Sequence, residues 1–119
     1  MPTRDEHVAK AEGNQSVNDL LDTASQSKID WKLTISFYTA MHYVEAYLAR
    51  NKGEHLRSHK TRDNSVASDS ELCKVRTEYA HLKFYGYNAR YEPPQFTAQD
   101  VKAAEGYLAT LKAYLLPLL

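Results

Sequence analysis

Apolar residues recur at helical spacing through most of the chain, and no stretch alternates apolar and polar residues as a strand would. The strongest pattern lies in residues 30–49, DWKLTISFYTAMHYVEAYLA. We expect the helix that it predicts to be contacted from more than one side, with the rest of the chain packed around it. Its two adjoining stripes are Trp31, Ile35, Tyr38, His42 and Glu45 in one, and Phe37, Met41, Val44 and Leu48 in the other.

Capping and turn residues predict where the first two helices begin and end. A first helix is expected over residues 4–26. The central helix is expected to begin at Asp30, whose carboxylate can accept from free backbone amides, and to stop at Gly53, which tolerates a left-handed backbone. The apolar side of the first helix is expected at Val17, Leu20, Leu21 and Ala24.

Similar signals predict a short helix and a long one in the middle of the chain. Ser58 can cap a short helix that runs to about residue 66. Ser68 and Glu71 have the spacing of a capping box, which predicts a further helix ending near Asn88. Its core side is expected at Leu72, Val75, Tyr79 and Leu82.

A last helix follows the Pro93-Pro94 pair, which a helix cannot continue through. Thr97 with Asp100 predicts its start, and Pro117 closes it. Its apolar stripe contains Val101, Ala104, Leu108, Leu111 and Leu115.

These elements predict an all-α fold. Because short connections make consecutive helices antiparallel, we expect an up-and-down four-helix bundle with one additional short helix. The length of 119 residues suits one domain over residues 1–119, in which residues 1–13 are the part expected to fray.

Composition narrows the classes of partner and compartment. Fifteen basic residues balance fifteen acidic ones, so binding to nucleic acid must come from a local patch. No apolar run approaches the length of about 20 residues that spans a membrane, and the first ten residues, MPTRDEHVAK, do not resemble a signal peptide. We therefore expect a cytoplasmic protein without a membrane partner. The single cysteine, Cys73, is expected as a small buried side chain.

Ionisable side chains gather between residues 55 and 64. If this segment were helical throughout, His55, His59 and Arg62 would share one face. An imidazole that moves a proton beside a guanidinium that stabilises negative charge can cleave a phosphodiester without metal. The same residues are equally consistent with a solvated, charged connection. The segment contains His55, Arg57, His59, Arg62, Asp63 and Asn64.

Other candidate site residues have a structural explanation as well as a functional one. His42 is expected as a core histidine satisfied by Tyr38 and Glu45, and Arg90 with Tyr91 as the cap of a helix end, where a cation complements the dipole. His55 and His59 have the spacing of a zinc face, but we predict no metal and no cofactor because no third ligand has a sensible spacing. The absence of phosphate-loop, nucleophile-elbow and dinucleotide motifs excludes ATPases, serine hydrolases and dehydrogenases of those types.

Three blocks resemble the HEPN superfamily of small helical proteins: residues 30–49, HLRSHKTRDN at 55–64 and YAHLKFYGYNARYE at 79–92. The resemblance implies a four- or five-helix bundle that forms a homodimer, often with an RNA-related role. Many members are metal-independent endoribonucleases, including toxins and phage-defence effectors, and others are binding modules. A His-x3-His-x2-Arg-Asn pattern falls on His55, His59 and Arg62, with Asp63 where asparagine is usual. Arg50 with His55 matches an Arg-x4-6-His motif.

The first hypothesis is therefore an RNA-acting module, in its catalytic form a metal-independent ribonuclease. His59, Arg62 and His55 would be catalytic. RNA or phosphate would be held by Arg57, Arg50, Asn64 and Arg90, and the supporting residues would be Tyr38, His42 and Tyr91.

Two alternatives remain open. One is a non-catalytic dimeric module, in which the charged segment anchors the short helix and the tyrosine-rich faces bind a partner protein or antitoxin. The other is a nucleotide-binding module in which Arg57 and Arg62 hold phosphates. Burial of His55 and His59 against Glu or backbone groups would favour the interaction module, whereas an open groove at a two-fold axis would favour the nuclease.

Overall fold

The computed structural model describes residues 1–91 and 96–119, and this part of the chain is helical without any strand. The all-α prediction is thereby confirmed. The predicted break at Pro93 and Pro94 lies outside the described residues. The five α-helices of the described ranges are α1 (Arg4–Asp19), α2 (Gln26–Lys52), α3 (His59–Ser68), α4 (Arg76–Tyr91) and α5 (Ala98–Leu115). Two short 3-10 helices, η1 (Leu72–Val75) and η2 (Leu116–Leu118), precede α4 and follow α5.

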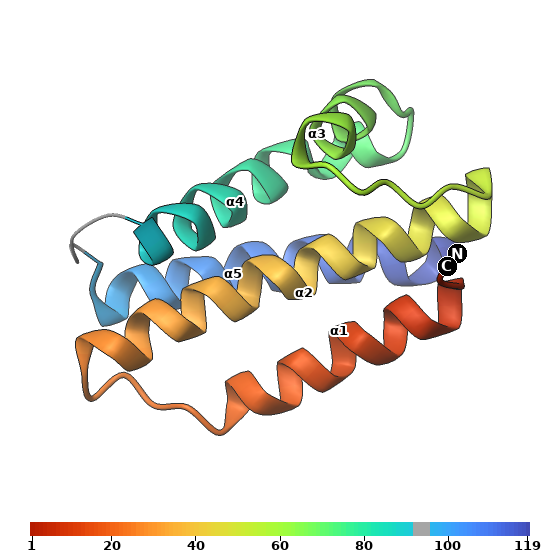
Figure 1. Cartoon of the computed structure of the whole chain (residues 1–119). Coiled ribbons are helices and arrows are strands. Elements are labelled where there is room, and N and C mark those ends of the chain that lie inside the picture. Colours follow the sequence, from red (N-terminus) through yellow and green to blue (C-terminus); the bar gives the residue numbers. More distant parts are fainter. Residues whose placement is uncertain (92–95) are drawn as a thin grey trace.

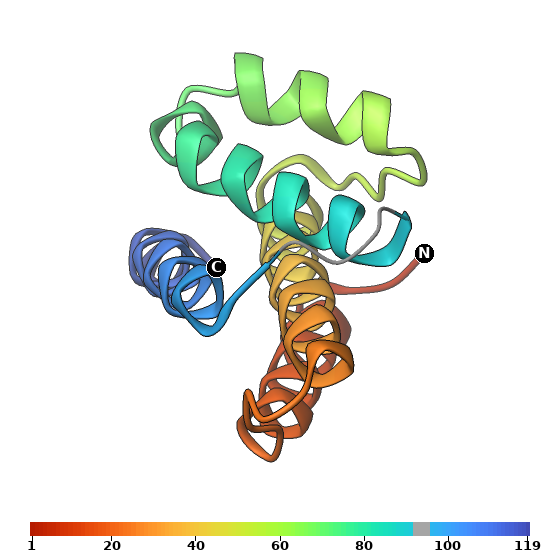
Figure 2. The ribbon, with the colours of Figure 1, turned by 90° about the vertical axis from the view of Figure 1, so that its left-hand side faces the viewer.

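Helix α2 is the centre of the fold and contacts α1, α4 and α5. Figure 1 shows these four long helices lying along the molecule, each opposite in direction to the one before it in the chain. In the end-on view of Figure 2, α1 and α4 lie on opposite sides of α2, and α3 lies crosswise beyond α4. The prediction that the central helix is contacted from several sides is confirmed.

The apolar core lies where α2 meets α4 and α5. Phe37 and Leu48 of α2 are almost fully buried, as are Leu82 of α4 and Leu111 of α5. The apolar stripe predicted for the last helix is buried in full. A long, regular apolar stripe faces the core whichever helices pack against it. The buried members of that stripe are Val101, Ala104, Leu108, Leu111 and Leu115.

Helix α1 differs from its prediction in length and in its buried face. It ends at Asp19, not at residue 26, and Val17 and Leu20 are exposed. The buried side chains are His7, Ala11 and Asn18, so the segment expected to fray contributes two of them. Polar contacts explain this orientation, since the Asn18 side-chain amide donates to the Ser36 hydroxyl of α2 at 3.1 Å.

A buried lysine explains both the end of α1 and the exposure of Trp31. The Lys32 ammonium group donates to the backbone carbonyls of Asn18 at 2.8 Å and Leu21 at 3.0 Å. These carbonyls lie at and just beyond the end of α1, where a cation is favourable. Lys32 therefore faces α1, and the neighbouring Trp31, expected in a core stripe, is 61% exposed.

The helix ends were predicted correctly where the capping signal is local. Gly53 ends α2 in a left-handed conformation with φ of 64°, Ser58 caps α3, and Thr97 with Asp100 forms the capping box of α5. The predicted start of α2 at Asp30 was wrong, because Ser25 is the N-cap and Asp30 lies inside the helix.

Asp69, and not Ser68, organises the approach to α4. Its Oδ1 atom accepts from the backbone amides of Glu71 and Leu72 and from the Tyr47 hydroxyl, at 2.8, 3.0 and 2.9 Å. Burial opposes ionisation, but the backbone and tyrosine donors together lower the pKa of Asp69. Helix α4 consequently begins after η1 and ends at Tyr91. Cys73 in η1 is exposed, which corrects the expectation that it is buried.

None of the described helices has both the length and the hydropathy needed to span a membrane.

We predict that Gly86→Ala lowers the free energy of unfolding by about 1–3 kcal/mol, because a core residue that is too large forces its neighbours apart. A Cβ atom at Gly86 of α4 would lie 2.5 Å from the Cβ atom of the buried Phe37. Urea unfolding followed by circular dichroism measures the change.

Gly106 of α5 provides the matched control, because a Cβ atom there meets nothing within 4 Å. Gly106→Ala is expected to raise the free energy of unfolding by about 0.5–1 kcal/mol through helix propensity. Equal effects of the two substitutions would contradict the close packing of α4 on α2.

Candidate functional site

The charged segment after α2 folds back onto that helix around one buried carboxylate. Glu45 of α2 is 1% exposed. Its Oε1 atom lies 2.7 Å from Arg62 Nε of α3, and its Oε2 atom accepts from the backbone amide of Leu56 at 3.1 Å. Glu45 thus holds both the loop at 53–58 and the first turn of α3.

Arg62 is committed to this internal network. Besides Glu45, its guanidinium donates to the Leu56 carbonyl at 2.7 Å and lies 3.3 Å from His59 Nδ1. Its side chain is only 5% exposed. Arg62 therefore fastens α3 and the loop to α2, and the catalytic and phosphate-binding roles suggested for it stay predictions that this geometry does not favour.

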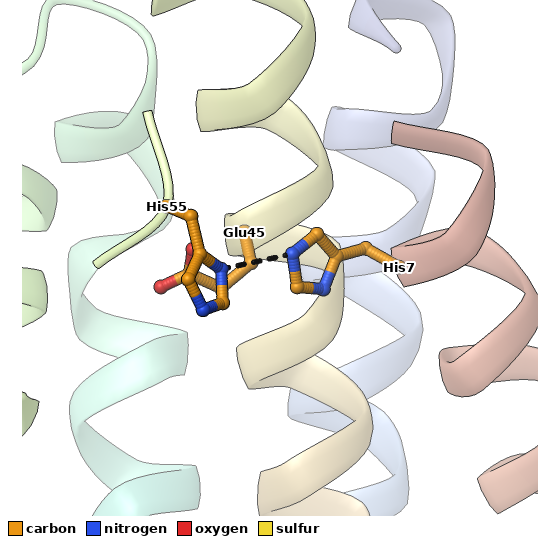
Figure 3. Close-up of side chains that lie close together, drawn as sticks. All are labelled: His7, Glu45 and His55. Atoms are coloured by element: carbon orange, nitrogen blue, oxygen red, sulfur yellow. Dashed lines mark hydrogen bonds and ion pairs between the residues drawn. The ribbon is translucent and has the colours of Figure 1, made fainter. Parts of the chain in front are cut away.

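Four histidines from four different segments surround the Glu45–Arg62 pair. His7 of α1 lies 3.1 Å from His42 of α2, measured between Nδ1 atoms. The other nitrogen of His7, Nε2, lies 3.2 Å from His55 Nδ1, as Figure 3 shows. His55 Nδ1 also lies 3.4 Å from Glu45 Oε2. His59 of α3 completes the group beside Arg62.

Burial favours the neutral forms of three of these rings, those of His7, His42 and His59. It lowers the pKa of His42 to about 4, with further lowering by the nearby His7 and Lys10. Burial also lowers the pKa of His7, and burial together with the Arg62 charge lowers that of His59. A neutral imidazole has one donor and one acceptor nitrogen, so His7 can donate through one nitrogen and accept through the other.

Sequence reasoning missed His7 and the partner of His42. His42 was expected to be satisfied by Tyr38 and Glu45, but its hydrogen-bond partner is His7. A weak signal was present, because His7, Ala11 and Asn18 lie on one face of a helix at i, i+4 and i+11. That stripe is small and polar, so a search for apolar periodicity passed over it.

The other predicted site residues fall into two groups. Arg90 of α4 donates to the Tyr38 hydroxyl and packs over the ring of Tyr91 at 4.9 Å, so these three residues do converge. They come from α2 and α4, and besides burial the Arg90 charge also helps to lower the pKa of His59. The remaining three are exposed and are not brought to either group: Arg50, Arg57 and Asn64.

A groove of about 480 Å³ runs between α3 and α4. Phe84 and Tyr87 line it and are 57% and 49% exposed. Two polar atoms in its lining are buried without a hydrogen-bond partner among the described residues, the Tyr79 hydroxyl and Asp63 Oδ1. Burial raises the pKa of Tyr79, so this hydroxyl is protonated near neutral pH. Asp63 uses its other oxygen in an ion pair with Lys83.

Comparisons with known proteins add nothing to this geometry. No protein-family model matches the chain, and no curated protein or solved structure matches it either. The function must therefore be inferred from the residues themselves, and the resemblance to the HEPN superfamily stays a hypothesis.

We predict that Arg62→Met lowers the free energy of unfolding by about 3–5 kcal/mol, because it leaves the Glu45 carboxylate buried without its cation. The double variant Glu45→Leu with Arg62→Met is expected to regain most of the loss, since both charges are then removed. Urea unfolding of the single and double variants measures both effects.

Lys28→Met is the control for loss of one positive charge, because the pair of Lys28 with Asp22 lies on the surface. Little change is expected. A small effect of Arg62→Met, comparable to that of Lys28→Met, would show that the Glu45–Arg62 pair does not hold the loop and α3.

Proposed function

We propose that this protein is an RNA-binding module of the HEPN type, which holds a nucleotide of single-stranded RNA in the groove between α3 and α4. The observation that carries the proposal is the groove with the exposed rings of Phe84 and Tyr87, whose walls also hold two buried polar atoms without a hydrogen-bond partner among the described residues, Tyr79 Oη and Asp63 Oδ1. A buried polar atom without a partner costs stability, so a small movement of these side chains that lets a ligand supply hydrogen bonds is favourable. The volume suits a small ligand or one nucleotide.

The exposed rings of Phe84 and Tyr87 supply stacking surfaces. Unstacked bases of single-stranded RNA bind to aromatic side chains in this way, and each stacked base contributes about 1–3 kcal/mol. Arg90 lies beside this wall, with its guanidinium 6.0 Å from the centre of the Tyr87 ring. A guanidinium in this position can contact the phosphate that follows a stacked base.

The charges that line the groove also support RNA as the ligand, although the whole chain has no net charge. Arg76 and Lys83 line the groove. Lys83 is paired with Asp63, so Arg76 is the groove cation more readily available to a phosphate. The groove therefore provides the local patch that RNA binding requires.

The unpartnered oxygen of Asp63 suggests which bases fit. A carboxylate accepts hydrogen bonds from an exocyclic amino group, such as N4 of cytosine, and uracil has no such group. We therefore expect cytosine-containing RNA to bind more tightly than uracil-only RNA.

We predict that Tyr87→Ala weakens binding of fluorescently labelled oligocytidylate by about 5- to 150-fold, which is the loss of one stacked base. Tyr87→Phe is the matched control, because it keeps the ring and is expected to bind like the wild type. Fluorescence anisotropy at a fixed, low salt concentration measures the affinities, with oligouridylate as the second probe.

Equal binding by Tyr87→Ala and the wild type, or no binding at all, would overturn the proposal. The same RNA incubated with the protein in excess EDTA is expected to remain intact. Degradation that disappears in His59→Ala, with an unchanged melting temperature, would instead establish the catalytic form of the hypothesis.

A second surface favours the homodimer, or the antitoxin or other protein partner, that the resemblance implies. Trp31 and Tyr91 are 61% and 65% exposed. Trp31 lines a shallow pocket with Ala89 and Arg90, which places it next to the end of α4. Tryptophan, tyrosine and arginine are the residues that contribute most to protein interfaces.

We predict that the wild type self-associates at high concentration and that Trp31→Ala weakens this association by tenfold or more, about 1.4 kcal/mol or above, as expected for a central interface residue. Light scattering over a concentration series measures the molar mass. Val17→Ala, at an exposed position on α1, is the control. A monomer at every concentration, or an unaffected Trp31→Ala, would exclude this surface as the dimer interface.

A further inference from the structure

We propose that His7, Glu45 and His55 form a binding site for a transition-metal dication such as Zn²⁺. These residues come from α1, α2 and the loop before α3, and one ligand atom from each lies within 4.8 Å of the other two. Figure 3 shows the His7 ring and the Glu45 carboxylate both directed towards His55. The site uses none of the residues that line the α3–α4 groove. Metal binding and RNA binding can therefore be tested separately.

The spacing of the atoms fits a tetrahedral metal. With metal–ligand bonds of about 2.0–2.1 Å, two ligands of a tetrahedral ion lie about 3.3 Å apart. His7 Nε2 lies 3.2 Å from His55 Nδ1, and His55 Nδ1 lies 3.4 Å from Glu45 Oε2. Both of these separations match the tetrahedral edge, and the ligand atoms of the remaining pair, His7 and Glu45, lie within 4.8 Å of one another.

Hydrogen bonding alone leaves this group of atoms incompletely satisfied. His55 Nδ1 carries at most one proton, which can be donated to His7 Nε2 or to Glu45 Oε2 but not fully to both. Whichever acceptor is left faces His55 without a proton between them. A cation bound by all three lone pairs removes this conflict.

The surroundings already hold the ligands in the orientation that a metal needs. His7 can donate through Nδ1 to Nδ1 of His42, 3.1 Å away, and that tautomer leaves Nε2 free to bind. Glu45 Oε1 is held by Arg62, which leaves Oε2 directed to His55. Metal-binding histidines and carboxylates generally have such outer partners.

The ligand set also indicates which cations bind. Two imidazoles and one carboxylate suit Zn²⁺, Co²⁺ or Ni²⁺, whereas Mg²⁺ and Ca²⁺ require mainly oxygen ligands. Arg62 compensates the charge of Glu45, which further disfavours ions that depend on anionic oxygens. The His55 side chain is 21% exposed, so ions can reach the site and a water molecule can supply the fourth ligand. The H-x3-H spacing of His55 and His59 is not used, because His59 lies against Arg62.

The experiment is a titration of EDTA-treated and desalted protein with Co²⁺ and Zn²⁺. We expect one Co²⁺ per chain with the visible absorption of a tetrahedral complex, displaced by Zn²⁺, and a higher melting temperature with Zn²⁺ but not with equal Mg²⁺. His7→Gln and His55→Gln should each weaken binding by more than about 100-fold, because ligand loss exceeds the 10–100-fold typical of outer partners. His42→Ala should weaken binding by about 10–100-fold as a positioning residue.

His59→Gln and His81→Gln are the matched controls, since His59 faces Arg62 and His81 stacks on Tyr107. Both are expected to bind like the wild type. Unchanged binding in His7→Gln, equal loss in the controls, or no Co²⁺ complex at all would overturn the proposal. If a variant fails to fold, imidazole ¹⁵N spectra of the wild type decide the question. Zn²⁺ must then shift His7 Nε2 and His55 Nδ1 and leave His81 unchanged.

Discussion

The buried carboxylate of Glu45 is the constraint on which the rest of the structure depends. A carboxylate in the interior of a helical bundle loses its hydration, and this loss is tolerable only if cations and amides replace the water. Arg62 and the Leu56 amide provide these replacements, and His55 Nδ1 lies 3.4 Å from the same carboxylate. The fold-back of the loop and α3 onto α2 brings these partners to Glu45.

The same interaction occupies Arg62 in the interior, and for this reason the proposed function is assigned to the groove. Arg62 faces Glu45, and Asp63, the next residue, lies about 100° further around α3 and lines the groove. The residue that would bind phosphate in a nuclease is thus used to hold the fold, while its neighbour is one of the residues that line the groove. The burial of Arg62 and the pairing of His55 with Glu45 are the features that favour a binding module over a nuclease.

The sequence predicted those parts of the fold that depend on neighbours along the chain. The stripe from Val101 to Leu115, the Ser58 cap and the Gly53 termination are local signals, and all three are observed. Helix α1 could not be predicted in this way, because its position is set by polar contacts with Lys32 and Ser36 of another helix. Apolar periodicity contains no information about such pairs.

The candidate site was still harder to predict from patterns of neighbouring residues in the sequence. The segment at 55–64 could be recognised from its histidines and arginines, but His7 lies 35 residues from His42 and 48 from His55 in the chain. Only the packing of α1 against α2 brings these rings together. Glu45 was visible in the helical pattern, but nothing in the pattern shows that one carboxylate serves both the histidines and Arg62.

Glu45 also connects the two proposed sites physically. In Figure 2, α1 and the α3–α4 pair lie on opposite sides of α2. One oxygen of Glu45 faces the histidine cluster and the other binds Arg62, whose neighbour Asp63 lines the groove. A cation at Oε2 would draw charge from the carboxylate and loosen its hold on Arg62. The two proposed sites share no lining residue, and the Glu45–Arg62 pair is the structural connection between them.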